Sequence, residues 1–347
     1  MNTARRILSS LILLAALWTA SSPAQTVSLR NDAVKDAAVT ANEQKISDLL
    51  NYGLGAVKQK DVRRALSYFE QALILSRKSG NAMFEAHALV SISSVYINIG
   101  DRKQALKYLQ QSLVPIRAIG ERLVEASTLT GIGTQYRGMN EQAKALDFYR
   151  QALAIQHQMG DTEGETFTLN HIGLSLNEMG EREQALVYYG QALALARKLN
   201  QPYSVASALH NIGAIYDDLG EHRRAADYFQ EAAQIFHSIH NASSEATALN
   251  SLGVVYYSLS DNSEALKFYQ QALRLHRTVL DWRGEAMTLT NISYVYYRIG
   301  DNQHYVQMLR EAAAIYDRIG DHDKARQAHA DIEQFSSKSP VSKKKHE

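Results

Sequence analysis

The amino-acid sequence predicts an all-α protein, a right-handed α-α solenoid of seven helical hairpins followed by a C-terminal capping helix. Three observations support this prediction. One apolar pattern recurs at a fixed interval of forty residues, its internal spacing follows a helical period, and a residue that favours a helix end stands between the halves of each copy. A single hairpin cannot bury its apolar face alone, so the copies are expected to stack into one core.

The repeated pattern consists of a leucine, a branched or aromatic residue three positions later, and a small residue directly after it. Its seven copies are Leu49/Tyr52/Gly53, Leu89/Ile92/Ser93, Leu129/Ile132/Gly133, Leu169/Ile172/Gly173, Leu209/Ile212/Gly213, Leu249/Leu252/Gly253 and Leu289/Ile292/Ser293. Sixteen positions after the leucine, six copies carry an alanine such as Ala145, and four positions further a large residue such as Tyr149. The small residue and the alanine predict close packing between the two helices of a copy.

Turn residues divide each copy into two antiparallel helices. Gly100-Asp101 and Gly180-Glu181 are examples of the turn within a copy. Glycine and asparagine adopt the left-handed conformation that ends a helix, and an acidic residue suits the positive start of the next helix. The predicted repeats span 46–85, 86–125, 126–165, 166–205, 206–245, 246–285 and 286–325.

The N-terminus has the features of a secretory signal. Arg5 and Arg6 precede an apolar run over residues 7–20, and the small residues of Ser22-Pro23-Ala24 suit cleavage by a signal peptidase. We therefore predict a signal peptide at 1–24 and an exported protein, periplasmic or extracellular, with no membrane span after cleavage. The alternative is an uncleaved anchor, although the apolar run is short for a membrane span.

Residues 25–45 form an N-terminal segment with helical potential. The first-helix positions that follow are apolar and predict an exposed strip, made of Leu50, Leu54, Val57, Val90 and Ile97. A strip of that size is unusual on a monomer. Either the N-terminal segment folds over it, or a partner or a second copy of the chain covers it.

The C-terminal end departs from the repeat. Tyr305 stands where the other copies have alanine, so the second helix of the seventh repeat is expected to pack less closely or to shift. Residues 326–336 predict a capping helix with a charged outer side. Residues 337–347 contain Pro340 and three consecutive lysines, and predict a disordered basic tail.

Composition and motifs exclude several classes of function. The chain has 37 Lys and Arg against 36 Asp and Glu, so it lacks the strongly basic character of a general nucleic-acid binder. It has no cysteine, and no phosphate-binding loop, nucleophile elbow or zinc-protease motif. His171 and His210 occupy neighbouring positions of successive first helices, but two histidines fall short of a zinc site. We predict no metal and no cofactor.

The repeated residues resemble a known family. The series Leu-x-x-Ile-Gly-x-x-Tyr, then Gly-Asp or Gly-Glu, then Ala-Leu-x-x-Tyr-x-x-Ala, with Leu209 to Ala232 as one copy, resembles the tetratricopeptide repeat. The forty-residue length, with Gln151-Ala152-Leu153 and Gly164-Glu165, is similar to the kinesin-light-chain and Leu-Gly-Asn-repeat type. The resemblance covers residues 46 to about 336.

The resemblance also implies which positions of each first helix face a concave groove. The candidates for peptide binding there are Arg137, Asn170, His171, Asn177, His210, Asn211, Asp217, Asn250, Tyr257, Asn291, Tyr294, Tyr297 and Arg298. An asparagine amide offers two donors and an acceptor to a peptide backbone, and the tyrosines are candidate apolar anchors. Two alternatives remain open. The asparagines can bridge neighbouring helices, and the tyrosines can pack on the cap or on the seventh repeat.

These features predict an exported, non-enzymatic scaffold or adaptor that binds a protein or peptide segment in its groove. Two other functions stay open. The array can be the sensing part of a larger signalling system, or a structural spacer that associates with itself. An enzyme is the weakest prediction, because no catalytic motif supports it.

Overall fold

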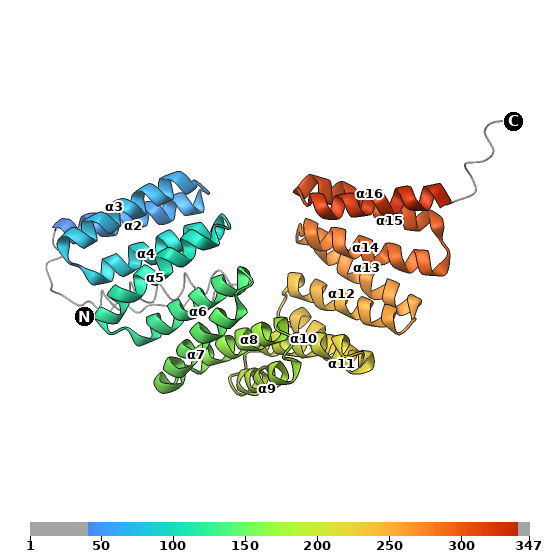
Figure 1. The fold of residues 1–347 in the computed structure, drawn as a ribbon, viewed down its shortest axis with the longest axis horizontal. Helices are drawn as coiled ribbons and strands as arrows, with labels where there is room; N and C mark the ends of the chain where they lie inside the picture. Colours follow the sequence, from blue (N-terminus) through green and yellow to red (C-terminus); the bar gives the residue numbers. More distant parts are fainter. Residues whose placement is uncertain (1–40, 339–347) are drawn as a thin grey trace. The chain divides into compact units, whose positions relative to one another are not determined.

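The computed structural model describes residues 41–338, which form fifteen α-helices and no strand (Figure 1). The helices are α2 (Ala41–Lys58), α3 (Val62–Ser79), α4 (Ala82–Asn98), α5 (Arg102–Ile119), α6 (Arg122–Gly138), α7 (Gln142–Met159), α8 (Thr162–Glu178), α9 (Arg182–Lys198), α10 (Pro202–Asp218), α11 (His222–Ser238), α12 (Ala242–Ser258), α13 (Asn262–Thr278), α14 (Trp282–Ile299), α15 (Asn302–Ile319) and α16 (His322–Lys338). Even-numbered helices up to α14 are the first helices of the predicted hairpins, and odd-numbered helices are the second.

The chain divides into two compact units, residues 1–195 and 196–347, with the division inside α9. Within each unit, the two helices of a hairpin pack together, and the second helix packs on the first helix of the next hairpin. Figure 1 shows this stacking in chain order from α2 to α8 and from α10 to α16. Consecutive packing of hairpins confirms the predicted all-α solenoid.

The helices end and begin at the predicted turn residues. Gly80 and Asn140 have left-handed backbones, with φ of 67° and 63°. Such a residue ends a helix because its backbone cannot continue the right-handed turn. After several of the turns, an aspartate or asparagine side chain caps the next helix: Asp101 Oδ1, for example, accepts a hydrogen bond from the backbone N–H of Gln104 at 3.0 Å.

The two helices of each hairpin contact each other through side chains of complementary size. The glycine of the repeated pattern faces an aromatic ring, and a Cβ on Gly133 would lie 2.6 Å from Cε1 of Tyr149. Five hairpins combine glycine with Phe or Tyr at this contact, whereas the two hairpins with serine have leucine, at Ser93/Leu109 and Ser293/Leu309. Leucine lacks the ring that excludes a side chain. The repeat therefore preserves the summed volume of the contact rather than one pair of residues.

Ion pairs recur at the turns between hairpins. Near the end of the second helix, Arg117 Nε binds Glu125 Oε1 at 2.8 Å, and the glutamate is buried. At one turn Val205 replaces the glutamate, and Arg197 binds Glu231 of the following second helix instead. The same ion pair over eight positions occurs at Arg77/Glu85 and Arg277/Glu285, and at this spacing His157 and His237 are hydrogen-bonded to Glu165 and Glu245.

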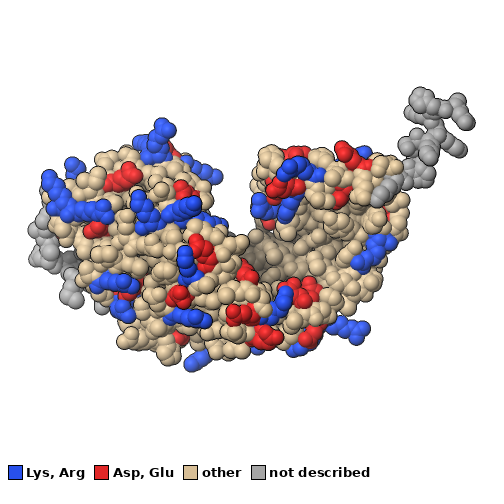
Figure 2. All heavy atoms as spheres, viewed as in Figure 1, with Lys and Arg blue, Asp and Glu red and all other residues tan. Residues whose placement is uncertain are grey.

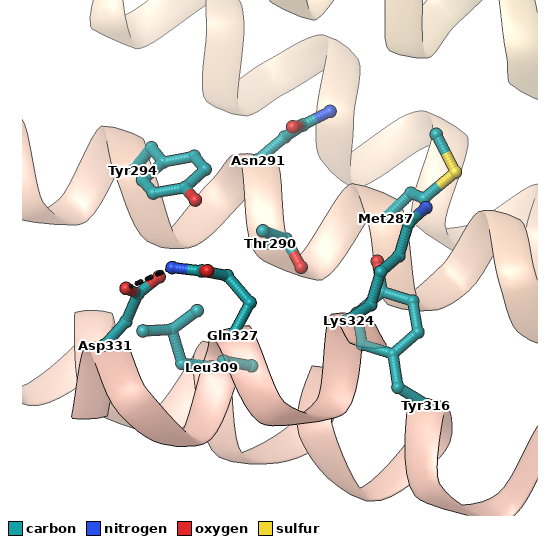
Figure 3. A pocket seen from close by; sticks show the side chains of 10 residues that line it. Met287, Thr290, Asn291, Tyr294, Leu309, Tyr316, Lys324, Gln327 and Asp331 are labelled. Carbon is teal, nitrogen blue, oxygen red and sulfur yellow. Dashed lines mark hydrogen bonds between the residues drawn. The ribbon is translucent and has the colours of Figure 1, made fainter. Parts of the chain in front are cut away.

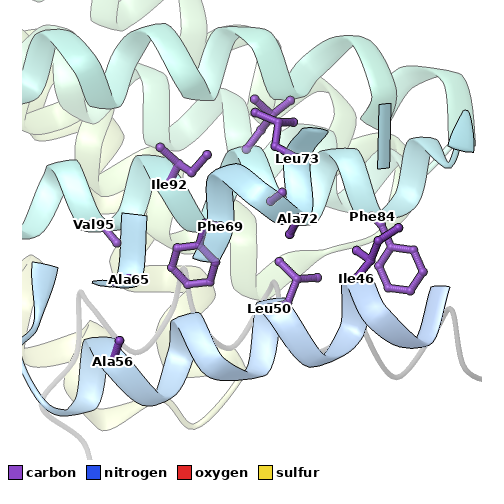
Figure 4. Close-up of a cluster of buried hydrophobic side chains, with 12 residues drawn as sticks. Ile46, Leu50, Ala56, Ala65, Phe69, Ala72, Leu73, Phe84, Ile92 and Val95 are labelled. Carbon is purple, nitrogen blue, oxygen red and sulfur yellow. The ribbon is translucent and has the colours of Figure 1, made fainter. Parts of the chain in front are cut away.

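The predicted apolar strip at the N-terminal end is wrong for its first residues. Leu50 is 3% exposed and belongs to a core cluster with Phe69 and Ile92 (Figure 4). Leu54 and Val57 are partly buried against the same cluster. The interface of α2 with α3 and α4 takes up these side chains, so they do not form an exposed surface that needs a cover.

The predicted repeat boundaries lie too late in the chain. The second hairpin begins at α4, whose cap is Asn81, whereas the predicted start is residue 86. The capping side chain, and not the first leucine, sets the start of the helix, so the predicted boundaries fall inside first helices. The capping helix is longer than the predicted 326–336, because α16 spans His322–Lys338. The predicted signal peptide and tail residues 339–347 lie outside the described residues.

The capping helix continues the forty-residue register and buries one face. Ala325 and Ala328 are buried against the seventh hairpin, and Phe335 lies 5.2 Å from the ring of Tyr305. Tyr305 is itself buried, and Ala312 and Ala313 of α15 are fully buried. The large residue in place of the repeat alanine therefore packs on the cap, and the predicted loosening of the second helix is not seen.

Candidate functional site

The predicted groove residues of the C-terminal unit hold successive first helices together. Asn250 Oδ1 in α12 accepts hydrogen bonds from Thr288 Oγ1 and Asn291 Nδ2 in α14, at 3.1 Å and 3.2 Å. Arg298 lies over the ring of Tyr257, 3.3 Å from its centroid, and donates to the Tyr257 carbonyl. These polar groups are used within the protein, as in the alternative that the sequence left open for the asparagines.

Two predicted groove residues of the N-terminal unit also have internal partners. Arg137 Nη1 in α6 binds Glu178 Oε1 in α8 at 2.6 Å. His171 packs on the rings of Tyr149 and Phe167, with centroids 5.4 Å and 4.4 Å away. Burial, and then the charge of Arg137, lower the pKa of His171 to about 3. This histidine is therefore neutral at neutral pH and serves as a packing residue.

The other predicted residues of α8 and α10 are largely occupied as well. The ring of His210 lies 5.0 Å from that of Phe229, and burial lowers its pKa to about 4. Asp217 Oδ1 binds His222 Nδ1 at 2.7 Å. The remaining candidates on these helices are half-buried amides, namely Asn170, Asn177 and Asn211.

The predicted tyrosine anchors of α14 differ from each other. Tyr297 is 58% exposed, but its ring lies 5.1 Å from Tyr305 and 6.5 Å from Phe335. It therefore packs on both the seventh hairpin and the cap. Tyr294 is 40% exposed and lines a cavity beside α16.

This cavity has a volume of about 280 Å³ and lies between α14, α15 and α16 (Figure 3). Its lining residues are Met287, Thr290, Asn291, Tyr294, Leu309, Tyr316, Lys324, Gln327, Ala328 and Asp331. Buried Leu309 and Ala328 give it an apolar floor, and hydroxyl, amide and charged groups surround that floor. Asn291 and Tyr294 are the predicted groove residues that the structure brings together here.

The cavity lies where α16 lacks the side chains that make the hydrogen bonds between α12 and α14. The positions forty residues after Thr288 and Asn291 are Ala328 and Asp331. Ala328 has no hydroxyl group, and Asp331 Oδ1 accepts a hydrogen bond from Gln327 Nε2 of its own helix at 2.9 Å. The space between α14 and α16 therefore stays open at the level where α12 and α14 are bonded.

Two charged side chains of α16 border the cavity. Lys324 Nζ lies 5.5 Å from the ring centroid of Tyr316, and in residues 41–338 it forms no ion pair. Asp331 likewise has no cationic partner in that range. Burial, followed by the charge of Asp331, raises the pKa of Tyr294, so its hydroxyl stays protonated and can donate.

Sequence reasoning missed Lys324, Gln327 and Asp331. The charged residues of the capping helix predict a solvated outer side, whereas these three side chains line the cavity. The forty-residue period was the available signal, since it places Asp331 at the same position as Asn291.

The cavity is lined by several kinds of polar group. Its polar groups are amides, hydroxyls, one amine and one carboxylate, without a histidine or cysteine beside them. Across the described residues, no group of three or more His, Asp or Glu side chains is placed to hold a metal. None of the helices α2 to α16 combines the length and apolar character that crossing a membrane requires. On the face drawn in Figure 2, acidic side chains lie among the basic ones.

Comparisons with known families agree with this architecture. Models of the tetratricopeptide repeat match residues 86–113, 165–238 and 244–318, which together make up just over half of the chain. Among curated protein sequences, none matches. The family matches include both α14 and α15, two of the helices that form the cavity.

Solved structures share the fold at low sequence identity. BtubC (BKLC) from P. vanneervenii has a TM-score of 0.57 and 20% identity, over 63% of this chain and 92% of that one. A signal transduction ATPase with a tetratricopeptide repeat sensor, from Pyrococcus horikoshii, has a TM-score of 0.63 and 19% identity, over 84% of this chain but only 42% of that one. A Rap protein complexed with competence and sporulation factor has a TM-score of 0.56 and 15% identity, over 85% of this chain and 98% of that one. Together with the repeats, the family matches establish that this chain belongs to the tetratricopeptide repeat family.

Proposed function

We propose that this chain is an exported, non-enzymatic adaptor that binds a peptide or protein segment on the first-helix surface of its C-terminal unit. Tetratricopeptide repeats are a fold of protein interaction and sensing. The observation that carries the proposal is the cavity between α14 and α16. There, Ala328 and Asp331 of α16 take the places of Thr288 and Asn291 of α14, and Asp331 is bonded within its own helix.

The cavity combines the two kinds of contact that a peptide needs. Hydrogen bonds contribute about 1 kcal/mol each, so polar groups alone fall short of the roughly 8 kcal/mol of micromolar binding. Met287 and Tyr294 stand beside the polar groups and are 41% and 40% exposed. Because these side chains are already more than half buried, covering each of them completely contributes about 1 kcal/mol. The two anchors therefore add to the hydrogen bonds in holding a segment at the cavity.

The solved relatives support two versions of this function. The Rap protein is complexed with competence and sporulation factor, so an array of this fold and nearly this length holds a second molecule. The Pyrococcus horikoshii protein uses a tetratricopeptide repeat array as a sensor, which favours the alternative of a sensing module within a larger signalling system. In both versions the array recognises a ligand and catalyses nothing.

Export is proposed from the sequence. Arg5, Arg6 and the apolar run over residues 7–20 have the composition of a secretory signal, and Ser22-Pro23-Ala24 suits its cleavage. Expressing the full chain in a bacterium and reading the N-terminal residue of the product by mass spectrometry tests this. We expect a chain that starts at Gln25 in the periplasm. A full-length chain in the membrane fraction would favour the anchor.

Capture of a partner tests the adaptor function. Mature protein, a Tyr294→Ala variant and a Tyr52→Ala variant are immobilised and exposed to the envelope fraction of the native cells. Tyr52 is the matched control because it is 60% exposed and lies in α2, on the other unit. We expect a protein that purified mature chain and Tyr52→Ala bind directly and that Tyr294→Ala loses. Equal binding by all three would place the site elsewhere, and no partner would favour the structural spacer.

A further inference from the structure

The charges at the cavity between α14 and α16 specify a ligand more closely than its shape does. We propose that this cavity recognises a peptide segment in the polyproline II conformation that carries one acidic and one basic side chain three residues apart. The inference rests on the proposed peptide-binding function and adds to it the charge pattern of the ligand. The acidic side chain lies at Lys324 and the basic side chain at Asp331.

The spacing follows from the geometry of α16. Lys324 and Asp331 are seven residues apart, which is two helical turns or about 10.5 Å along the axis. Figure 3 shows the two side chains at opposite ends of the cavity, with Gln327 between them. A peptide in the polyproline II conformation advances about 3.1 Å per residue with three residues per turn, so side chains three positions apart share a face and lie about 9.3 Å apart. A segment running along α16 therefore presents charges to both ends when they are three positions apart.

Neither of these two charges has an ion-pair partner within residues 41–338. Lys324 Nζ lies over the Tyr316 ring, 5.5 Å from its centroid. The carboxylate of Asp331 accepts a hydrogen bond from a neutral amide, that of Gln327. Arg326, in contrast, pairs with Asp323. Both charges that border the cavity can therefore pair with a ligand.

Groups between the two charges can bond the backbone of such a segment. Asn291 lines the cavity, although it donates its Nδ2 to Asn250. The amide of Gln327 and the hydroxyl of Tyr294 supply further polar groups. A peptide backbone alternates donors and acceptors in both directions. The segment can therefore run either way along α16, which makes the spacing of its charges, and not their order, the distinguishing feature.

Binding of synthetic peptides tests this charge pattern. Four fluorescein-labelled peptides with blocked ends and an alanine and glutamine background carry Glu-x-x-Lys, Glu-x-x-Glu, Lys-x-x-Lys or no charge. Fluorescence anisotropy with the mature chain is expected to rank Glu-x-x-Lys first, about fivefold tighter than each of the others, since an exposed ion pair contributes up to about 1 kcal/mol. The preference is expected to weaken as salt is added.

A charge reversal gives the sharper comparison. In Lys324→Glu both ends of the cavity are acidic, so we expect Lys-x-x-Lys to become the tightest ligand. Arg326→Glu is the matched control, because it makes the same change of charge on the same helix, at a side chain that pairs with Asp323 and does not line the cavity. It is expected to keep the preference for Glu-x-x-Lys.

Three results would overturn the charge pattern. They are equal affinity for all four peptides, the same switch of preference in Arg326→Glu, and no binding of any peptide up to about 1 mM. Each leaves the adaptor function standing if the captured partner still distinguishes Tyr294→Ala from Tyr52→Ala. If the partner does not distinguish those two variants, the proposed function itself fails.

Discussion

The α12–α14 junction and the α14–α16 junction occupy the same place in the repeat. Hydrogen bonds close the first, whereas the second leaves a cavity. At the first, Asn250 accepts hydrogen bonds from Thr288 and Asn291, and the two helices are joined. At the second, Ala328 and Asp331 stand at the equivalent positions, and a cavity of about 280 Å³ lies between the helices. A polar residue on the inner helices therefore does not by itself indicate a ligand site.

The difference shows how a repeat array can create a binding site. In the interior, Asn250 bonds to Thr288 and Asn291 of the next first helix. At the cap the register continues, but Ala328 and Asp331 do not make the corresponding bonds, and Thr290, forty residues after Asn250, donates to Ala286 of its own helix. The following predictions test whether the interior surface, formed by the first helices up to α14, is closed by their hydrogen bonds, and whether the cap surface, between α14 and α16, is open.

Acid is expected to have the largest effect on stability, because it protonates histidines that are buried in the first helices. Burial lowers the pKa of His87 and His210 to about 4, from 6.5 in the unfolded chain. Between these values the unfolded chain binds more protons, so stability is full above pH 6.5 and is lost as the pH falls towards 4. Each histidine is expected to cost about 3 kcal/mol of unfolding free energy across this range. Urea unfolding at about pH 7.5 and about pH 4.5 measures the loss.

A pair of variants checks that the buried histidines cause this loss. His210→Phe keeps a ring beside Phe229 and removes the proton site, so its unfolding free energy should fall less with acid than that of the unmodified chain. His322→Phe is the control, because this histidine is exposed at the start of α16. The same pH dependence in both variants would contradict the assignment.

The second effect is a difference in stability between the two junctions. Asn250→Ala removes the acceptor of two hydrogen bonds and leaves Thr288 and Asn291 without it, so we expect a loss of about 1–3 kcal/mol. Gln327→Ala removes an exposed side chain bonded only within its own helix, and should cost less than about 0.5 kcal/mol. Chemical denaturation of both variants measures the difference. Equal costs would mean that the interior surface is not closed by this bond.

The third effect is a loss of binding when the cavity is filled. Ala328 is buried on the cavity floor, and Ala328→Leu places a larger side chain there. We expect partner binding to weaken about tenfold, which corresponds to about 1.4 kcal/mol, with the helical circular dichroism unchanged. Ala330→Leu, at an exposed position of the same helix, is the control. Binding unaffected by Ala328→Leu would mean that the ligand does not enter the cavity.

The smallest effect is a difference in coupling energy. A double-mutant cycle of Asn250→Ala and Asn291→Ala should give about 0.5–1 kcal/mol, because these side chains share a hydrogen bond across two helices. A cycle of Gln327→Ala and Asp331→Ala should give less than about 0.5 kcal/mol, as expected of an exposed contact within one helix. A larger coupling in the second cycle would reverse the comparison.

The sequence predicts the repeat well because packing leaves a strict periodic signal. Gly133 and Tyr149 stand at fixed places, and their contact depends only on the geometry of one hairpin. The size match between Ser93 and Leu109 is equally local. Such contacts repeat in every copy, so one sequence with seven copies shows them without any comparison.

The candidate site could be predicted only in part, because it depends on departures from the period. Asn291 and Tyr294 were predicted, but their different roles follow from what the next first helix offers them. The exposed strip predicted around Leu50 failed for a related reason, since position in the repeat does not say whether an apolar side chain turns into the core. Contacts between helices that are not neighbours in the chain decide both cases.

Hydrogen–deuterium exchange of the mature chain with its captured partner tests the central claim most directly. If the interior first-helix surface is closed and the cap junction is open, partner binding should slow exchange in α14 around residues 287–294 and in α16 around residues 324–331. The first helices α6, α8 and α10 should exchange as in the free chain. Slower exchange in those three helices, with α14 and α16 unchanged, would contradict the claim.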